Sequence, residues 1–284
     1  MNNSTDSSST PIYPLADPHS VLPKFPDVGF ICVFDTETTS LEKPFCYNIG
    51  YVILNTATGE IVKKSEYVVE QVWHNLMLFT TAYYANKRPI YVGRMRSRQC
   101  ELNKFGYITQ AMIRDFREYD VHHAFAYNSG FDEKVFAFNC DWFKCINPLE
   151  GVQVHDIRGH VHKKIGFTKG YRDYCDAHDL YTESGNYSTT AESVYRYVSG
   201  KDEFIEEHTA LADAVIEAEI LRHCVEQGCE WAQDYKVYTT IPRITMKDFK
   251  VIDAEGVTHT FPFTKQTKIR GEYGYKLTIQ EPKK

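Results

Sequence analysis

The stretch FICVFDTETT, residues 30–39, decides the fold. Its first five residues are apolar and predict a buried strand that leads directly into Asp35. Side chains alternate between the two faces of a strand, so Asp35 and Glu37 are expected on the same face. Two neighbouring carboxylates repel each other unless a divalent cation lies between them. This stretch therefore indicates a candidate metal site, although a surface loop with two acids is the commoner explanation of a single such pair.

The surrounding pattern predicts a mixed α/β sheet. We expect strands at residues 30–34, 46–54, 61–69, 123–127 and 152–156. We expect helices at residues 73–85, 101–119, 132–139, 171–180, 190–198 and 210–227. Residues 88–98 carry four arginines and favour a loop or insertion. The prediction is a five-stranded sheet flanked by helices, in which Thr209 or a neighbour caps the last helix.

The two ends of the chain differ from its middle. Residues 1–27 are rich in Ser, Thr, Asn and Pro, which predicts a disordered tail rather than a secretory signal. Two β-hairpins are expected at residues 245–263 and 268–279. We therefore divide the chain into a main domain, residues 28–235, and a small β-rich appendage, residues 236–284. The appendage has ten Lys and Arg against five Asp and Glu, which suits contact with a polyanion or an ordinary solvated surface.

Cysteine usage and hydropathy favour a cytoplasmic protein. The eight cysteines form no CxxC pair and lie in apolar or helical stretches, so we expect buried, reduced thiols. No run of about 18 apolar residues occurs, so no membrane span is expected.

Two later segments carry further candidate groups. Asp132 ends YNSGFD (residues 127–132) at a strand-to-helix junction, where ligand sites of α/β sheets gather but where helix N-terminal acids are also ordinary. Asp213 lies in HTALADA (residues 208–214), on the apolar side of the last helix, where an unpaired acid is costly. His208 precedes that helix, and a lone histidine there is more often structural than catalytic.

Taken together, DTETT at 35–39, YNSGFD at 127–132 and HTALADA at 208–214 resemble the DEDDh family of 3′→5′ exonucleases. That family includes RNase T, oligoribonuclease and the epsilon subunit of bacterial DNA polymerase III. The resemblance spans roughly residues 30–227 and implies an RNase H-like fold. The sequence departs from the family at Tyr127, where histidine is frequent, and at Ser40, where many relatives have glycine.

The resemblance implies a two-metal hydrolysis that releases nucleoside 5′-monophosphates from a 3′ end. Asp35, Glu37 and Asp213 are expected to hold one ion. Asp35 is expected to bridge to a second ion, which Asp132 supports. Oxygen ligands favour Mg²⁺ or Mn²⁺. His208 is the expected general base.

Substrate contacts are expected from further residues near the acids. The resemblance places Thr38 at the terminal 3′-hydroxyl and Asn128 at nearby backbone or substrate. Leu41, Phe45 or Phe131 is expected to pack on terminal bases, although core packing explains Phe131 equally well.

The identity of the substrate is left open by the motifs. Their form favours single-stranded DNA, with RNA as the alternative, because the same metal chemistry serves both. The resemblance to proofreading enzymes also makes a replication or polymerase partner a candidate. A non-catalytic nucleic-acid-binding adaptor is a further alternative, which the presence of all four acids and the histidine disfavours.

Overall fold

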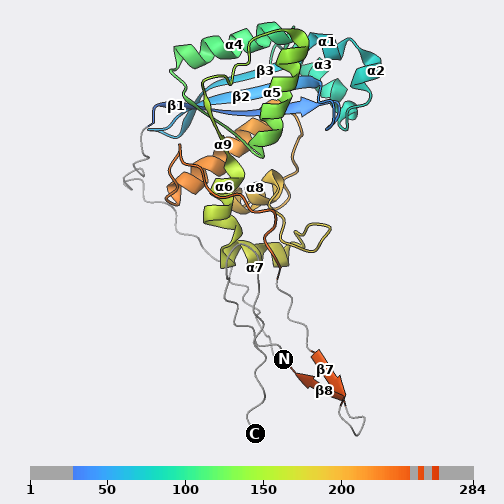
Figure 1. Cartoon of the computed structure of the whole chain (residues 1–284), viewed down its shortest axis with the longest axis vertical. Helices are drawn as coiled ribbons and strands as arrows, with labels where there is room; N and C mark the ends of the chain where they lie inside the picture. The colour runs from blue at the N-terminus through green and yellow to red at the C-terminus, as the bar shows by residue number, and fades with distance from the viewer. Residues whose placement is uncertain (1–27, 244–248, 253–257, 262–284) are drawn as a thin grey trace, which may run out of the picture.

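The computed structural model describes residues 28–243, 249–252 and 258–261 (Figure 1). The tail expected at residues 1–27 and the hairpin expected at residues 268–279 lie outside the described residues. Strand β7 (Phe249–Ile252) pairs antiparallel with β8 (Thr258–Phe261), which confirms a hairpin within residues 245–263. The boundary between a main domain and an appendage at residue 235 stays a prediction.

The main sheet has six strands in the order β4-β3-β2-β1-β5-β6. Their bounds are β1 (Phe30–Thr38), β2 (Cys46–Asn55), β3 (Glu60–Val69), β4 (Glu101–Asn103), β5 (His123–Ala126) and β6 (Gln153–Asp156). The first three strands form an antiparallel meander. Strand β5 joins β1 in parallel, β6 joins β5 in parallel, and β4 joins the opposite edge in parallel with β3.

The prediction of five strands was wrong by one edge strand. The sequence from Glu101 was expected to be helical, but Glu101–Asn103 first pairs with β3 as β4, and α4 begins only at Phe105. Three residues are too few to show the alternation that identifies a strand. Their pairing depends on the exposed edge of β3, which local sequence does not reveal.

The helical elements lie on both faces of the sheet. Their bounds are α1 (Glu70–Trp73), α2 (Leu76–Phe79), η1 (Ala85–Lys87), α3 (Arg88–Arg96), α4 (Phe105–Glu118), α5 (Ser129–Phe143), α6 (Ile157–Val161), η2 (His162–Gly166), α7 (Lys169–Ala177), α8 (Ala191–Ser199) and α9 (Ala210–Glu226). Helices α4 and α5 cover one face, and α9 with α6 and α8 covers the other (Figure 1).

Two further expectations between residues 70 and 100 need correction. The single helix expected at residues 73–85 is broken into the short helices α1 and α2 and the turns that follow them. The loop expected at residues 88–98 is mainly α3. Its arginines suggested solvent, but Pro89 suits the first helical turn and the Tyr91 side chain is fully buried.

The alternation along β1 decides which side chains face α9. Cys32 and Phe34 belong to the core beneath α4 and α5, whereas Ile31 and Val33 belong to the core beneath α9. The odd-numbered positions continue beyond Val33 with Asp35 and Glu37. The apolar residues of β1 thus anchor the strand in the core. The same alternation directs the two acids at its end towards α9.

Strand β2 fixes how closely α9 can approach these acids. Gly50 is the partner of Asp35 across the β1–β2 pair. A Cβ atom at Gly50 would lie 2.0 Å from the backbone nitrogen of Leu211. The missing side chain therefore lets the first turn of α9 rest directly on β2.

The first turn of α9 receives its side-chain capping bond from β2 and not from Thr209. Asn48 is the partner of Glu37 in the sheet, and its Oδ1 accepts the backbone N–H of Ala210 at 2.8 Å. Thr209 makes no side-chain cap; its hydroxyl donates to Glu207. Thr209 therefore lies at the expected N-cap position, but a strand side chain remote in sequence, and not the threonine hydroxyl, accepts the hydrogen bond.

Two bulk expectations can be compared with the structure. Seven cysteines are buried and Cys145 is half-buried, which confirms the expectation of burial for all but one. Across the part of the chain that the structure describes, every helix is too short or too polar to cross a bilayer.

Candidate active site

Three of the predicted acids meet at one point. Asp35 and Glu37 come from the end of β1, and Asp213 comes from the first turn of α9. One carboxylate oxygen from each lies within 4.8 Å of the others. Asp213 is 5% exposed, and its Oδ1 is buried without a hydrogen-bond partner. The predicted grouping of these three side chains is therefore what the structure shows.

The electrostatics of this group favour a bound cation. Burial is the main cause that raises the pKa of Glu37 to about 8 and that of Asp213 to about 9, and nearby acids add to it. The pKa of Asp35 is also raised, by burial and then by Asp132. The Tyr47 hydroxyl, 3.3 Å from Glu37 Oε2, offsets part of the effect on Glu37 by donating a hydrogen bond, and the charge of Lys87 also lowers the pKa. Such groups ionise together most easily beside a divalent cation.

The donor set also fits a metal ion on chemical grounds. Asp35, Glu37 and Asp213 offer only oxygen atoms, which suits Mg²⁺ or Mn²⁺ better than zinc. A buried carboxylate oxygen without a partner carries a desolvation penalty that a cation would remove. The orphaned Oδ1 of Asp213 is therefore the observation that a metal site explains best.

Asp132 lies beside this group but is held differently. It is 3% exposed in the first turn of α5, and its Oδ1 accepts a hydrogen bond from the Thr36 hydroxyl at 2.6 Å. Burial raises its pKa to about 7, although the Thr36 bond acts in the opposite direction. Among the nearby charges, Asp132 contributes most to the raised pKa of Asp35. The fourth acid thus belongs to the same electrostatic cluster without joining the three-carboxylate group.

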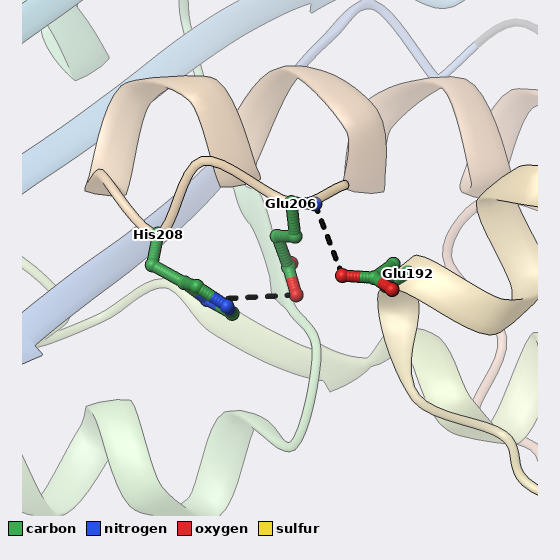
Figure 2. A group of neighbouring side chains, drawn as sticks. All are labelled: Glu192, Glu206 and His208. Atoms are coloured by element: carbon green, nitrogen blue, oxygen red, sulfur yellow. Dashed lines mark hydrogen bonds and ion pairs between the residues drawn. The ribbon is translucent and has the colours of Figure 1, made fainter. Parts of the chain in front are cut away.

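His208 lies at the entrance to α9 in a constrained conformation. Its backbone has φ 54°, in the left-handed region that is uncommon for residues other than glycine. Its ring stacks on Tyr84, with ring centroids 4.3 Å apart and an interplanar angle of 12°. Its Nδ1 lies 3.7 Å from Oε2 of Glu206 (Figure 2). Burial, followed by the charge of Lys87, lowers the pKa of His208.

Sequence reasoning missed several residues of this site. Glu217 is 3% exposed, accepts the Tyr127 backbone N–H at 3.2 Å, and has a pKa raised by burial and by Asp132. Its position four residues after Asp213 puts it on the same helix face, which was a usable signal.

A second missed group lies around His208. Glu192, Glu206 and His208 place one ligand-type atom each within 4.8 Å of the others (Figure 2). Burial and then Glu192 raise the pKa of Glu206 to about 7. The closeness of Glu206 to His208 in the sequence was a signal, whereas nothing local pointed to Tyr84.

The four predicted substrate-contact residues come from two places, the end of β1 with the loop after it and the start of α5. Thr38 ends β1, and its hydroxyl donates to the Ser40 carbonyl at 3.3 Å. Leu41 is 74% exposed. Asn128 is exposed immediately before α5, and Phe131 packs partly against the core beneath α4 and α5. Their contacts with substrate stay predictions.

Comparisons with known proteins identify the fold. No protein-family model matches the sequence, and no curated protein sequence matches it. A solved structure described as "3′-end specific recognition of histone mRNA stem-loop by 3′-exonuclease" has 15% identity and a TM-score of 0.50, and the match covers 92% of this chain and 76% of that one. This likeness shows the fold and confirms the expected RNase H-like α/β class.

Two other solved structures are similar at lower scores. The nuclease domain of 3′hExo, described as a DEDDh family member bound to rAMP, has 16% identity and a TM-score of 0.49, covering 75% of this chain and 98% of that one. Exonuclease I of E. coli in complex with a dA16 oligonucleotide has 11% identity and a TM-score of 0.43, covering 68% of this chain. The chain spans 40% of the length of that Exonuclease I chain.

Proposed function

We propose that this chain is a metal-dependent 3′→5′ exonuclease of the DEDDh type, which hydrolyses single-stranded nucleic acid and releases nucleoside 5′-monophosphates. One observation carries the proposal. The carboxylates of Asp35, Glu37 and Asp213 come together, and the Oδ1 atom of Asp213 is buried without a hydrogen-bond partner. The fold shared with a 3′-exonuclease supports the same reading of the site.

The metal ligands of the proposal are this chain's own acids. Asp35, Glu37 and Asp213 would hold the divalent cation, and Asp132 would support a second one from the start of α5. Bound Mg²⁺ or Mn²⁺ supplies Lewis-acid stabilisation of the phosphate and lowers the pKa of the attacking water. The buried Thr36–Asp132 hydrogen bond keeps that fourth carboxylate oriented.

His208 takes the proton of the attacking water in this proposal. Its lowered pKa keeps the imidazole neutral, and therefore able to accept a proton, at physiological pH. As the O–H bond of water breaks, its oxygen bonds to phosphorus and the bond to the leaving 3′ oxygen breaks. Thr38 and Asn128 would contact the terminal nucleotide, and Leu41 and Phe131 would pack on its base.

The partner of the site is a nucleic-acid 3′ end. The form of the motifs favours DNA. RNA is the second candidate, because the similar 3′-exonuclease is described as recognising a histone mRNA stem-loop. A polymerase or replication partner is not part of the proposal.

A digestion panel tests the proposal. Purified full-length protein is incubated with single-stranded DNA, duplex DNA, a mismatched 3′ end and single-stranded RNA of matched sequence. Each is labelled at the 5′ or the 3′ end, with EDTA, Mg²⁺ or Mn²⁺. We expect nucleoside 5′-monophosphates released from the 3′ end only when metal is present, with single-stranded DNA degraded faster than RNA. Binding without cleavage on every substrate would instead identify a non-catalytic adaptor.

A further inference from the structure

The backbone of the loop between α8 and α9 is tied to the body on both sides of His208. On the near side, the Glu206 N–H donates to Glu192 Oε2 at 3.0 Å (Figure 2). On the same loop, the carboxylate of Glu207 pairs with the guanidinium of Arg94. The far side is fixed by the cap on α9. With the backbone held, the remaining freedom at His208 is rotation of its side chain.

Two contacts restrict that rotation. Tyr84 lies parallel to the imidazole at a centroid distance of 4.3 Å, so it covers one face of the ring. Glu206 places its carboxylate 3.7 Å from Nδ1, and its own side chain is only 14% exposed. Among the described residues, no hydrogen bond or ion pair reaches Nε2 of His208. One ring nitrogen thus faces a carboxylate just beyond hydrogen-bond distance, and the other is open.

We propose that Tyr84 and Glu206 are positioning residues that hold the His208 imidazole for proton transfer; this rests on the function proposed above. In its ionised form the Glu206 carboxylate, although beyond hydrogen-bond distance of Nδ1, favours the tautomer with the proton on Nδ1 by electrostatic attraction. The lone pair is then on Nε2, where the proton of the attacking water is received. Tyr84 contributes by keeping the ring from turning its open nitrogen away.

A second cation site at Glu192, Glu206 and His208 is a weaker explanation of the same cluster. The carboxylate of Glu192 is already occupied, since it accepts from the Arg196 guanidinium and from the Glu206 backbone N–H. A carboxylate engaged by a guanidinium is a poor metal ligand, because the arginine already neutralises its charge. The arrangement is therefore better suited to holding the histidine than to binding an ion.

A double-mutant cycle tests the proposal by activity. We expect Glu206→Gln and Tyr84→Leu each to lower kcat about tenfold with KM little changed, a fraction of the effect of a general base. In a His208→Ala background the same substitutions should cause no further loss. The exposed residues Glu203 and Tyr107, the latter on α4, supply matched controls, Glu203→Gln and Tyr107→Leu, which should leave kcat unchanged.

The opposite outcomes are distinct. Losses that multiply in the His208→Ala background would overturn the proposal by showing that Glu206 or Tyr84 acts independently of the histidine. A rise in KM with kcat unchanged for Tyr84→Leu would assign that ring to substrate stacking instead.

A spectroscopic test needs no activity, so it separates this proposal from the exonuclease assignment. In NMR spectra of the full-length protein, the stacked Tyr84 ring should shift the His208 ring protons upfield. Tyr84→Leu should remove that shift, and Glu206→Gln should change the nitrogen shifts that report the tautomer. Wild-type spectra that both variants leave unchanged would overturn the positioning role. Altered spectra in a protein without nuclease activity would refute only the exonuclease assignment.

Discussion

The backbone N–H of Ala210 donates to Oδ1 of Asn48 at 2.8 Å, across 162 residues of sequence. Asn48 is the sheet partner of Glu37, so the residue that caps α9 lies opposite one of the site's acids. The same strand places Gly50 opposite Asp35 and under the first turn of α9. Strand β2 therefore sets the position of Asp213 relative to the two acids of β1.

Replacing Asn48 should damage both stability and activity. Asn48→Ala leaves the buried Ala210 N–H without an acceptor and also removes the 3.0 Å bond to the Tyr67 carbonyl. We expect the free energy of unfolding, measured in urea, to fall by about 1–3 kcal/mol, and we expect kcat to fall as well. The control Asn103→Ala, at the sheet edge where its amide meets only Glu101, should change stability by less than about 0.5 kcal/mol. Equal effects of the two substitutions would show that the cap is unimportant.

Two glycine-to-alanine changes should have opposite signs. Gly50→Ala forces a Cβ to within 2.0 Å of Leu211 nitrogen, so α9 must move and stability should fall by about 1–3 kcal/mol or more. Gly93→Ala, inside α3 with no atom within 4 Å of the added Cβ, should raise stability by about 0.5–1 kcal/mol. Thermal unfolding curves measure both. A neutral Gly50→Ala would contradict the close packing of α9 on β2.

Removing one acid should stabilise the metal-free protein while abolishing activity. Asp213→Asn removes an acid whose pKa is raised by burial and then by Glu206 and Glu37, so the Tm in EDTA should rise by several degrees, equivalent to about 1–2 kcal/mol. Adding Mg²⁺ or Mn²⁺ should raise the Tm of the wild type but not of the variant. Asp141 is exposed, so Asp141→Asn serves as the control. It should neither raise the Tm in EDTA nor remove the rise in Tm that metal causes. A lower Tm for Asp213→Asn in EDTA would argue against a repulsive cluster.

Acid should destabilise the protein through His162. Burial, followed by the charge of Arg158, lowers the pKa of His162 to about 4, and its Nδ1 accepts the Tyr238 backbone N–H at 3.0 Å. Between about pH 6.5 and pH 4 the unfolded chain binds a proton that the folded chain does not, so stability falls as pH falls.

The size of this effect is measurable against a variant. At about 1.4 kcal/mol for each unit of pKa, the full window corresponds to roughly 3 kcal/mol. His162→Gln should flatten that part of the stability–pH curve in denaturant titrations. Parallel curves for wild type and variant between pH 6.5 and 4 would contradict a buried neutral His162.

The features that the sequence predicted correctly are those that depend on local periodicity. The alternation of β1 placed Asp35 and Glu37 on one face, and the apolar side of the last helix placed Asp213 towards the core. Helix α3 was missed because its arginines suggested a solvent-exposed loop. In the folded protein, Arg94 instead forms ion pairs with Glu66 and Glu207, which are distant in sequence. Tyr84 could not be foreseen, since its stacking on His208 depends on how the segment between β3 and β4 folds back over the site.

The most direct measurement compares wild-type and Asp35→Asn proteins on a 5′-labelled single-stranded DNA of defined length. With Mg²⁺ or Mn²⁺, the wild type should produce a ladder that shortens from the 3′ end while the label is retained, and EDTA should stop it. Asp35→Asn should keep the wild-type circular dichroism spectrum and lose cleavage by at least about a hundredfold. Wild-type cleavage by the Asp35→Asn protein, or cleavage that persists in EDTA, would contradict a metal-dependent exonuclease built on this carboxylate group.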